Sequence, residues 1–295
     1  LLLAVAGMFG VGFAHSGFNL FDDYFDSKNG AVKRRQEMQD GGMRARMGKC
    51  SYLAAGGVTL ADTRRVATFF IGLGLLLGAL ILAIRGWEVL LFAGVTLVLG
   101  LAYAGSPLRL SYHGLGELLV GVVLGPLVVT AAYFVVCGRI DALAVWVSIP
   151  IGLLVANILN AHAIMDFGAD KAAGRTTFAI LLGSEKAGFA ASVVMVVLAY
   201  AAVVAGVTLG SLPLFSLAVF LTLPVAMTFI RLLYQYVQGD ASALEPRKWM
   251  GPFDHWETVK ERGTDWFMCR WFLSRNLVMF AVLCLALAGL TPWYL

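Results

Sequence analysis

Two groups of aspartates lie beside long apolar stretches, at Asp22-Asp23-Tyr24-Phe25-Asp26 and at Asp166-Phe167-Gly168-Ala169-Asp170. A carboxylate next to lipid hydrocarbon is energetically costly, so spaced acids at a membrane boundary indicate a functional site. Hard Mg²⁺ ions prefer carboxylate and phosphate oxygens, and usually reach a protein through one or two carboxylates. The two groups together predict a site that binds Mg²⁺ and, through the metal, a diphosphate.

Each aspartate group continues a polar stripe on a predicted helix. His15, Asn19, Asp22 and Asp26 follow a 4-3-4 spacing, and His162, Asp166 and Asp170 follow a 4-4 spacing. Residues at these intervals share one face of an α-helix. A single polar residue at a helix end is commonly a cap or a snorkelling side chain, but two acid stripes that end on the same side favour a shared site.

The chemistry that suits these acids is metal-assisted ionisation of an allylic diphosphate. The metal neutralises the diphosphate and makes it a leaving group. The prenyl cation left behind needs dry surroundings and electron-rich rings. The candidate rings are Phe18, Tyr24, Tyr103 and Tyr112, for each of which packing or a place in an interfacial aromatic belt is the alternative interpretation.

The composition indicates an integral membrane protein, because 60% of residues are apolar, 14% are charged and the mean hydropathy is +0.82. Apolar runs of about 20 residues can cross a bilayer as helices. The sequence predicts an all-α, polytopic bundle of eight such helices, at Leu1–Phe21, Arg65–Ile84, Glu88–Gly105, Leu115–Cys137, Leu143–Met165, Ala187–Leu209, Pro213–Val237 and Phe267–Leu290.

The loops between these helices alternate sides, and most Lys and Arg residues fall on one side, against only Arg85 and Arg139 in the loops of the other. By the positive-inside rule the basic side is cytoplasmic, and both acid groups lie on it. We expect one transmembrane domain over residues 1–295. Its cytoplasmic parts are a cap loop at 22–64 with the first acid motif, a second motif loop at 166–186 and an insertion at 238–265.

The remaining features exclude several classes of protein. The net charge of +4 is accounted for by membrane orientation and an anionic substrate, and no nucleic-acid motif is present. The four cysteines lack the spacing of a zinc site or a disulfide framework. Trp249 and Trp256 in the 238–265 insertion, with Trp266 directly after it, lie among mixed charges and predict a short helix in the lipid headgroup region.

At this point the residues resemble the UbiA superfamily of intramembrane prenyltransferases. The first acid group with Lys28 and Gly30 looks like that family's Asn-Asp-x-x-Asp motif, and Asp166-x-x-x-Asp170-Lys171 to Thr177 looks like its second. Between them, Tyr103-Ala104-Gly105-Ser106-Pro107 and Tyr112-His113-Gly114-Leu115-Gly116-Glu117 are similar to the branch that prenylates 1,4-dihydroxy-2-naphthoate for menaquinone. The resemblance implies a nine-helix fold, one helix of which would precede Leu1.

The resemblance also implies roles for individual residues. Asp22, Asp23, Asp26, Asp166 and Asp170 would hold Mg²⁺ and diphosphate. Cations meet phosphate oxygens directly. The implied diphosphate-binding residues are Asn19, Asp23, Lys28, Arg46, Lys49, Lys171 and Arg175, with Arg46 and Lys49 in a basic loop expected to close over the site.

Three positions depart from the family pattern. Asp22 stands where the family usually has Asn, Val32 stands where the naphthoate branch often has Asp, and His162-Ala163 replaces an Asn-rich segment. His15 and His162 are therefore candidates for the base that takes a proton from the acceptor, with hydrogen-bonded packing as the alternative role.

The resulting hypothesis is a Mg²⁺-dependent enzyme of the plasma membrane of a bacterium or archaeon, with its active-site loops in the cytoplasm. It would transfer a polyprenyl group from its diphosphate to an aromatic quinone precursor such as 1,4-dihydroxy-2-naphthoate. The alternatives are another acceptor, acceptor-free terpene cyclisation, a CDP-alcohol phosphotransferase or a membrane transporter. Widely separated acid groups disfavour the phosphotransferase, whose acids form one contiguous motif, and a basic loop beside the acids disfavours transport.

Overall fold

The computed structural model describes residues 1–28, 30, 33, 37, 51–54, 56–104 and 108–290. These residues form helices and turns, and within them the sole β-type pairing is an isolated bridge between His113 and Thr176. They pack as two compact units, which are taken separately below. The first unit comprises Leu1–Arg109 and Thr130–Ile140, and the second comprises Leu110–Val129 and Asp141–Leu295.

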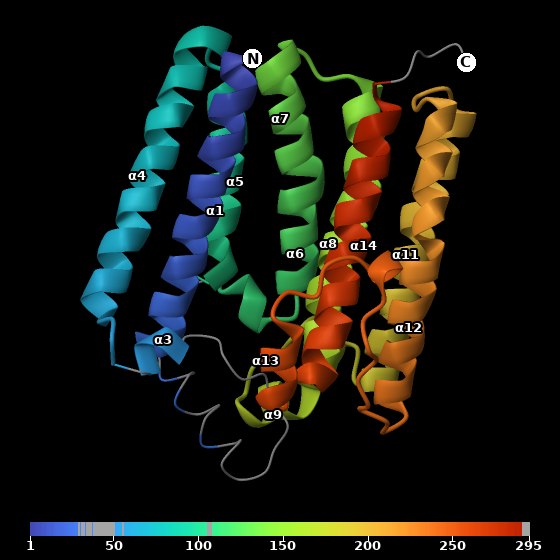
Figure 1. The fold of residues 1–295 in the computed structure, drawn as a ribbon. Helices are drawn as coiled ribbons and strands as arrows, with labels where there is room; N and C mark the ends of the chain where they lie inside the picture. The colour runs from blue at the N-terminus through green and yellow to red at the C-terminus, as the bar shows by residue number, and fades with distance from the viewer. Residues whose placement is uncertain are drawn as a thin grey trace. The chain divides into compact units, whose positions relative to one another are not determined.

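The first unit is built on an antiparallel pair of long helices, α1 (Leu2–Lys28) and α4 (Leu60–Arg85), drawn in blue and cyan in Figure 1. The short α3 (Ser51–Ala54), α5 (Val89–Ala104) and most of α7 (Val128–Cys137) complete it. Small residues bring α1 and α4 close together, since a Cβ on Gly17 would lie 2.7 Å from Ile71 Cγ1. Close approach through glycine is the usual way in which helices associate in lipid.

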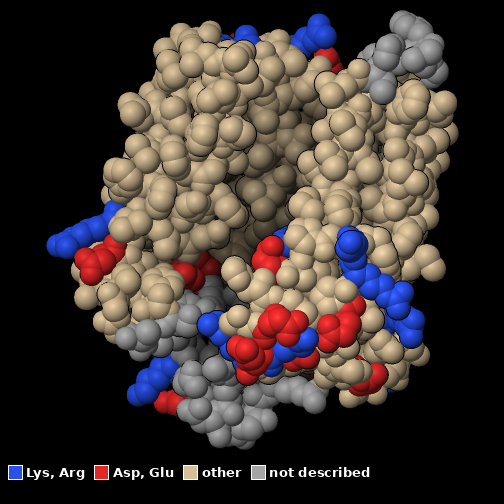
Figure 2. Space-filling view, in the orientation of Figure 1, with Lys and Arg blue, Asp and Glu red and all other residues tan. Residues whose placement is uncertain are grey.

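The second unit surrounds an apolar core. Its main helices are α6 (Gly116–Val122), α8 (Ala142–Met165), α11 (Glu185–Thr208), α12 (Leu223–Val237) and α14 (Asp265–Ala288). Shorter helices join them, namely η1 (Leu110–Tyr112), the π-helix η2 (Val123–Leu127), α9 (Phe167–Ala172), α10 (Phe178–Leu181), η3 (Leu214–Thr222), η4 (Lys248–Met250) and α13 (Trp256–Glu261). In Figure 2, most of the charged side chains visible over this unit gather at the end that carries α9 and α13.

The closest helix contact in the second unit involves backbone. A Cβ built on Gly125 would lie 2.3 Å from the Cα atom of Gly152, and one built on Gly121 would lie 2.7 Å from the Gly152 carbonyl oxygen. Pro126 lies in the π-helical turn η2. Because proline has no backbone N–H to donate, a regular α-helical hydrogen bond cannot form at this residue. The position of α8 is therefore fixed by direct backbone contact with α6 and η2.

The segment between α12 and α14 returns along these helices instead of leaving them. Asn276, halfway along α14, donates from its amide nitrogen to the Met250 carbonyl at 2.8 Å and the Pro252 carbonyl at 3.0 Å. Gly251 has a φ of +87°, and a Cβ there would lie 2.8 Å from the same amide nitrogen. Irregular backbone is tolerated at membrane depth only where protein groups satisfy it, as these do.

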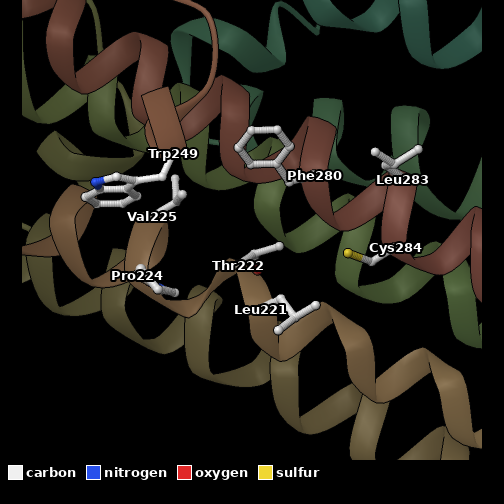
Figure 3. Close-up of a pocket in the computed structure, with 8 residues that line it drawn as sticks. All are labelled: Leu221, Thr222, Pro224, Val225, Trp249, Phe280, Leu283 and Cys284. Carbon is white, nitrogen blue, oxygen red and sulfur yellow. The ribbon is translucent and has the colours of Figure 1, made fainter. Parts of the chain in front are cut away.

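Trp249, at the tip of this returning segment, lies beside Val225 of α12 (Figure 3). An apolar pocket of about 350 Å³ is lined there by Leu221, Thr222, Pro224, Val225, Trp249, Phe280, Leu283 and Cys284. The expected short helix of the 238–265 insertion is present as α13. The place of α13 in the headgroup region stays a prediction. Trp249 lines the pocket together with Val225, which lies in the middle of the apolar span Leu214–Val237.

Seven helices among the described residues are long and apolar enough to cross a membrane, namely Leu2–Lys28, Leu60–Arg85, Gly116–Cys137, Ala142–Met165, Glu185–Thr208, Leu214–Val237 and Asp265–Ala288. They match seven of the eight expected spans. The remaining one corresponds to α5, which is apolar but has 16 residues, so the count of eight is not confirmed. The first helix also continues beyond the expected Phe21 to Lys28, so the first acid motif is helical throughout.

Candidate active site

The first acid motif lies on the last turns of α1, in the first unit. Asp26 is buried with 7% of its surface exposed, and Asp22 and Asp23 are half-buried. Asn19 and His15 lie on the same stripe one and two turns before Asp22, both exposed, with Asn19 Nδ2 and His15 Nε2 3.1 Å apart. Because α1 is uninterrupted, the helical face predicted from the 4-3-4 spacing is present.

Two contacts connect the first motif to its neighbours. The Tyr52 hydroxyl of α3 donates to Asp23 Oδ2 at 3.1 Å, which joins the chain that returns from the basic loop to the acid motif. The Lys28 ammonium lies 5.7 Å from the centroid of the Tyr24 ring. Of the other predicted residues, Phe18 and Tyr103 are half-buried in the same unit, whereas Arg46 and Lys49 lie outside the described residues.

The second acid motif occupies a break between two helices of the second unit. Helix α8 ends at Met165, Asp166 has φ −95° and ψ 9°, and α9 begins at Phe167. The Asp170 amide donates to the Asp166 carbonyl at 2.8 Å, so the two carboxylates stay one turn apart. Both side chains are buried, with 6% and 3% of their surfaces exposed.

Basic and aromatic residues surround this second pair. The Arg175 amide donates to the Asp170 carbonyl at 2.9 Å, and its guanidinium lies 5.4 Å from the centroid of the Tyr112 ring. The bridge between His113 and Thr176 brings the Tyr112 segment alongside the Arg175 segment. Asp170 and Arg175 of the second motif are thus neighbours of Tyr112, which was predicted from a separate stretch, while Lys171 is exposed.

The two candidate bases have different surroundings. His162 lies one turn before Asp166, with its ring 5.1 Å from the centroid of Phe267 on α14. His15 is exposed and paired with Asn19. An aromatic contact and a side-chain hydrogen bond are both compatible with a packing role, so a catalytic role for either histidine stays a prediction.

Glu117 is a third buried acid beside the second motif that the site prediction omitted. It has 6% of its surface exposed, and its Oε1 accepts a hydrogen bond from the Phe178 amide at 3.2 Å. Its carboxylate also interacts electrostatically with Arg175 and Asp170. Its Oε2 is buried without a hydrogen-bond partner among the described residues. An acid in the first turn of an apolar span was the signal in the sequence.

The donor set fits a hard divalent cation. The second motif offers two buried carboxylates one turn apart, and the first offers a buried carboxylate and two half-buried ones. In the part of the chain that the structure describes, no three His, Cys, Asp or Glu side chains gather closely enough to hold a metal on their own. Mg²⁺ needs only one or two carboxylates when a phosphate completes its coordination. That both motifs meet at one site stays a prediction.

Comparison with known proteins identifies the family of the chain. The model of the UbiA prenyltransferase family matches residues 1–251, so the chain belongs to that family. Together with the seven apolar helices, this makes it an integral membrane protein. The chain is 32% identical to the 1,4-dihydroxy-2-naphthoate octaprenyltransferase of Bacillus subtilis (strain 168) over 187 residues, which are 63% of this chain and 57% of that protein.

A second relative comes from Synechocystis sp.. The chain is 31% identical to the 2-carboxy-1,4-naphthoquinone phytyltransferase of Synechocystis sp. over 224 residues, which are 74% of this chain and 66% of that protein. The chain thus spans less than two thirds of the length of either relative. The search of solved structures found no match.

Proposed function

We propose that the protein transfers a polyprenyl group from its diphosphate to an aromatic acceptor, with 1,4-dihydroxy-2-naphthoate as the first candidate. The observation that carries the proposal is the buried pair Asp166 and Asp170 beside Arg175, in a chain of the UbiA prenyltransferase family. Both named relatives act on naphthalene-derived acceptors, by their names.

In this proposal, Asp166 and Asp170, with Asp22, Asp23 and Asp26, hold divalent metal, for which Mg²⁺ is our assignment. Held by these carboxylates, Mg²⁺ would neutralise the diphosphate and make it a better leaving group. Arg175 and Lys171, with Lys28 and Asn19, contact phosphate oxygens.

The bond between the prenyl C1 atom and the diphosphate oxygen breaks, and the oxygen keeps the electron pair. The Tyr112 and Tyr24 rings stabilise the cation. A ring carbon of the acceptor then bonds to C1. The same carbon loses its former substituent, either a proton or a carboxyl group released as CO₂, and the ring regains its aromaticity. His15 and His162 are the candidate bases for a proton released in this step.

The test uses purified protein in lipid nanodiscs with radiolabelled geranylgeranyl diphosphate, Mg²⁺ and a panel of aromatic acids. We expect a labelled aromatic product identified by mass spectrometry, and its loss on adding EDTA. Asp170→Asn should abolish the product, whereas Asp141→Asn, at the opposite end of α8, should not, since Asn is an equally good N-cap. Labelled hydrocarbon or alcohol formed without an acceptor would indicate a cyclase instead. No release of diphosphate under any condition would refute prenyl transfer.

We further propose that the acid motifs face the cytoplasm of a bacterial or archaeal cell, in its plasma membrane. The support is the concentration of Lys and Arg in the loops that carry these motifs. Labelling of single introduced cysteines in intact cells tests it. A cysteine at Ser184 should be protected from a membrane-impermeant maleimide, and one at Ser211 should react.

A further inference from the structure

Tyr236, near the end of α12, contacts the helix end that carries the second acid pair. Its hydroxyl donates to the carbonyl oxygen of Met165 at 2.7 Å. Met165 is the last residue of α8 and is buried, and Asp166 follows it directly. Carbonyls in the last turn of a helix lack part of their intrahelical bonding and are commonly satisfied from outside. Tyr236 therefore bonds the backbone at the break from which both aspartates project.

The Tyr236 ring contacts two side chains of α14. It stacks on Trp266, with the ring centroids 5.8 Å apart and the planes inclined by 11°. The guanidinium of Arg270 lies 5.4 Å from the Tyr236 centroid. The contacts with Trp266 and Arg270 restrict rotation of the Tyr236 side chain, and so they keep its hydroxyl directed at the Met165 carbonyl.

Arg270 is a buried cation that donates hydrogen bonds to four backbone carbonyls and to one cysteine sulfur. None of its surface is exposed. Its Nε donates to Leu232 O at 3.0 Å, and its Nη2 donates to Asp240 O and Ser242 O at 3.3 Å each, while its Nη1 donates to Trp266 O and to Cys269 Sγ. A charged group this deep is tolerated only when it is fully hydrogen-bonded. Arg270 thereby joins α12, α14 and the start of the returning segment.

We propose that Tyr236 is a positioning residue for Asp166 and Asp170, and that Arg270 keeps Tyr236 in place and connects it to the returning segment. The proposal rests on the assignment of these aspartates to metal and diphosphate under the proposed function. Tyr236 acts through the Met165 carbonyl, which sets the direction in which α8 gives way to α9, and with it the separation of the two carboxylates.

The test compares Tyr236→Phe with Tyr234→Phe in the full-length chain. Tyr236→Phe removes one hydroxyl and keeps the ring. Tyr234 lies two residues earlier on α12, and its ring is 50% exposed and packs on Phe189, so the same change there is a matched control. Mn²⁺ binding, followed by electron paramagnetic resonance with a non-hydrolysable thiolodiphosphate analogue of the prenyl substrate, reports on the site without turnover.

We expect Tyr236→Phe to bind Mn²⁺ about fivefold more weakly, the effect of losing one hydrogen bond. Its kcat should fall by a similar factor, and its melting temperature should stay within about 2 °C of the wild type. Tyr234→Phe should match the wild type in each measurement. Equal Mn²⁺ binding by both variants and the wild type would overturn the proposal, as would loss of binding accompanied by a large fall in melting temperature.

Arg270→Lys tests the second half of the proposal, because an ammonium has three donors and cannot reach all five acceptors. We expect weaker Mn²⁺ binding, and a double variant with Tyr236→Phe that is no worse than Arg270→Lys alone, as two residues acting through one contact require. Full additivity would refute the link between them. Wild-type protein that makes no prenylated product but shows this Mn²⁺ pattern would refute the proposed function and leave the positioning role standing.

Discussion

Asp22 and Asp26 lie on an uninterrupted helix that packs on α4 through small residues, whereas Asp166 lies at a break in the helix path and Asp170 one turn beyond it. In the first motif, the neighbouring Asp23 accepts a hydrogen bond from the Tyr52 hydroxyl. Near the second pair lie Glu117, Arg175 and Tyr236, which come from three other segments. Two acid pairs with similar spacing thus lie in different backbone settings, a continuous helix in the first unit and a helix break beside buried polar groups in the second.

The largest expected effect comes from neutralising one aspartate in each pair and comparing the two rates of prenyl transfer. Asp26→Asn and Asp170→Asn should each lower prenyl transfer by about a thousandfold, because each removes a charge that would hold the metal. Single-turnover rates with saturating Mg²⁺ measure the effect. Asp141→Asn serves as the control for both. If Asp26→Asn kept full activity, only the second pair would belong to the site.

Helix packing in the two units should respond in opposite directions to a single methyl group. Gly125→Ala places a Cβ 2.3 Å from the Gly152 Cα atom, and we expect it to destabilise the protein by about 1–3 kcal/mol. Gly78→Ala, on α4, meets nothing within 4 Å and should stabilise that helix by up to about 1 kcal/mol. Thermal unfolding in detergent distinguishes the two. Similar melting temperatures would show that the close contact in the second unit can relax.

Polar contacts around the second pair are tested by Glu117→Gln. The substitution keeps the shape of the side chain but removes the carboxylate that attracts the Arg175 guanidinium. Because Arg175 is proposed to contact the diphosphate, a less firmly placed guanidinium should raise the KM for the prenyl diphosphate about tenfold. Initial rates over a range of diphosphate concentrations measure it. Glu257→Gln, an exposed acid on α13 paired with Lys260, should leave KM unchanged. A fall in kcat at constant KM would assign Glu117 to the chemical step instead.

The smallest effect is expected from Asp22→Asn. The family usually has Asn at this position, and Asp22 is half-buried at the start of the first motif. We expect activity within about threefold of the wild type, because an amide oxygen can still coordinate a hard cation. The Mg²⁺ concentration for half-maximal rate is the sensitive readout. A loss comparable to that of Asp26→Asn would show that this chain has come to depend on the extra charge.

Much of the fold could be predicted from the sequence, because apolar runs of bilayer length identify helices directly. The spacing of His15, Asn19, Asp22 and Asp26 correctly predicted one helical face. Local patterns do not contain the pairing of Gly125 with Gly152 or the bond from Tyr236 to Met165, since these join residues far apart in the chain. Arg270 is visible in the sequence as a charge inside the expected span Phe267–Leu290, but the sequence does not indicate which backbone carbonyls it binds.

The returning segment has a consequence for how the protein is made. The carbonyls of Met250 and Pro252 accept hydrogen bonds from Asn276, which follows Met250 by 26 residues. During synthesis these carbonyls reach the translocation machinery before their partner exists, and lipid offers them no substitute. We therefore expect the stretch to wait in the aqueous compartment and to be drawn inward only after the final helix has inserted, so that a ribosome stalled before Asn276 would leave it accessible to protease.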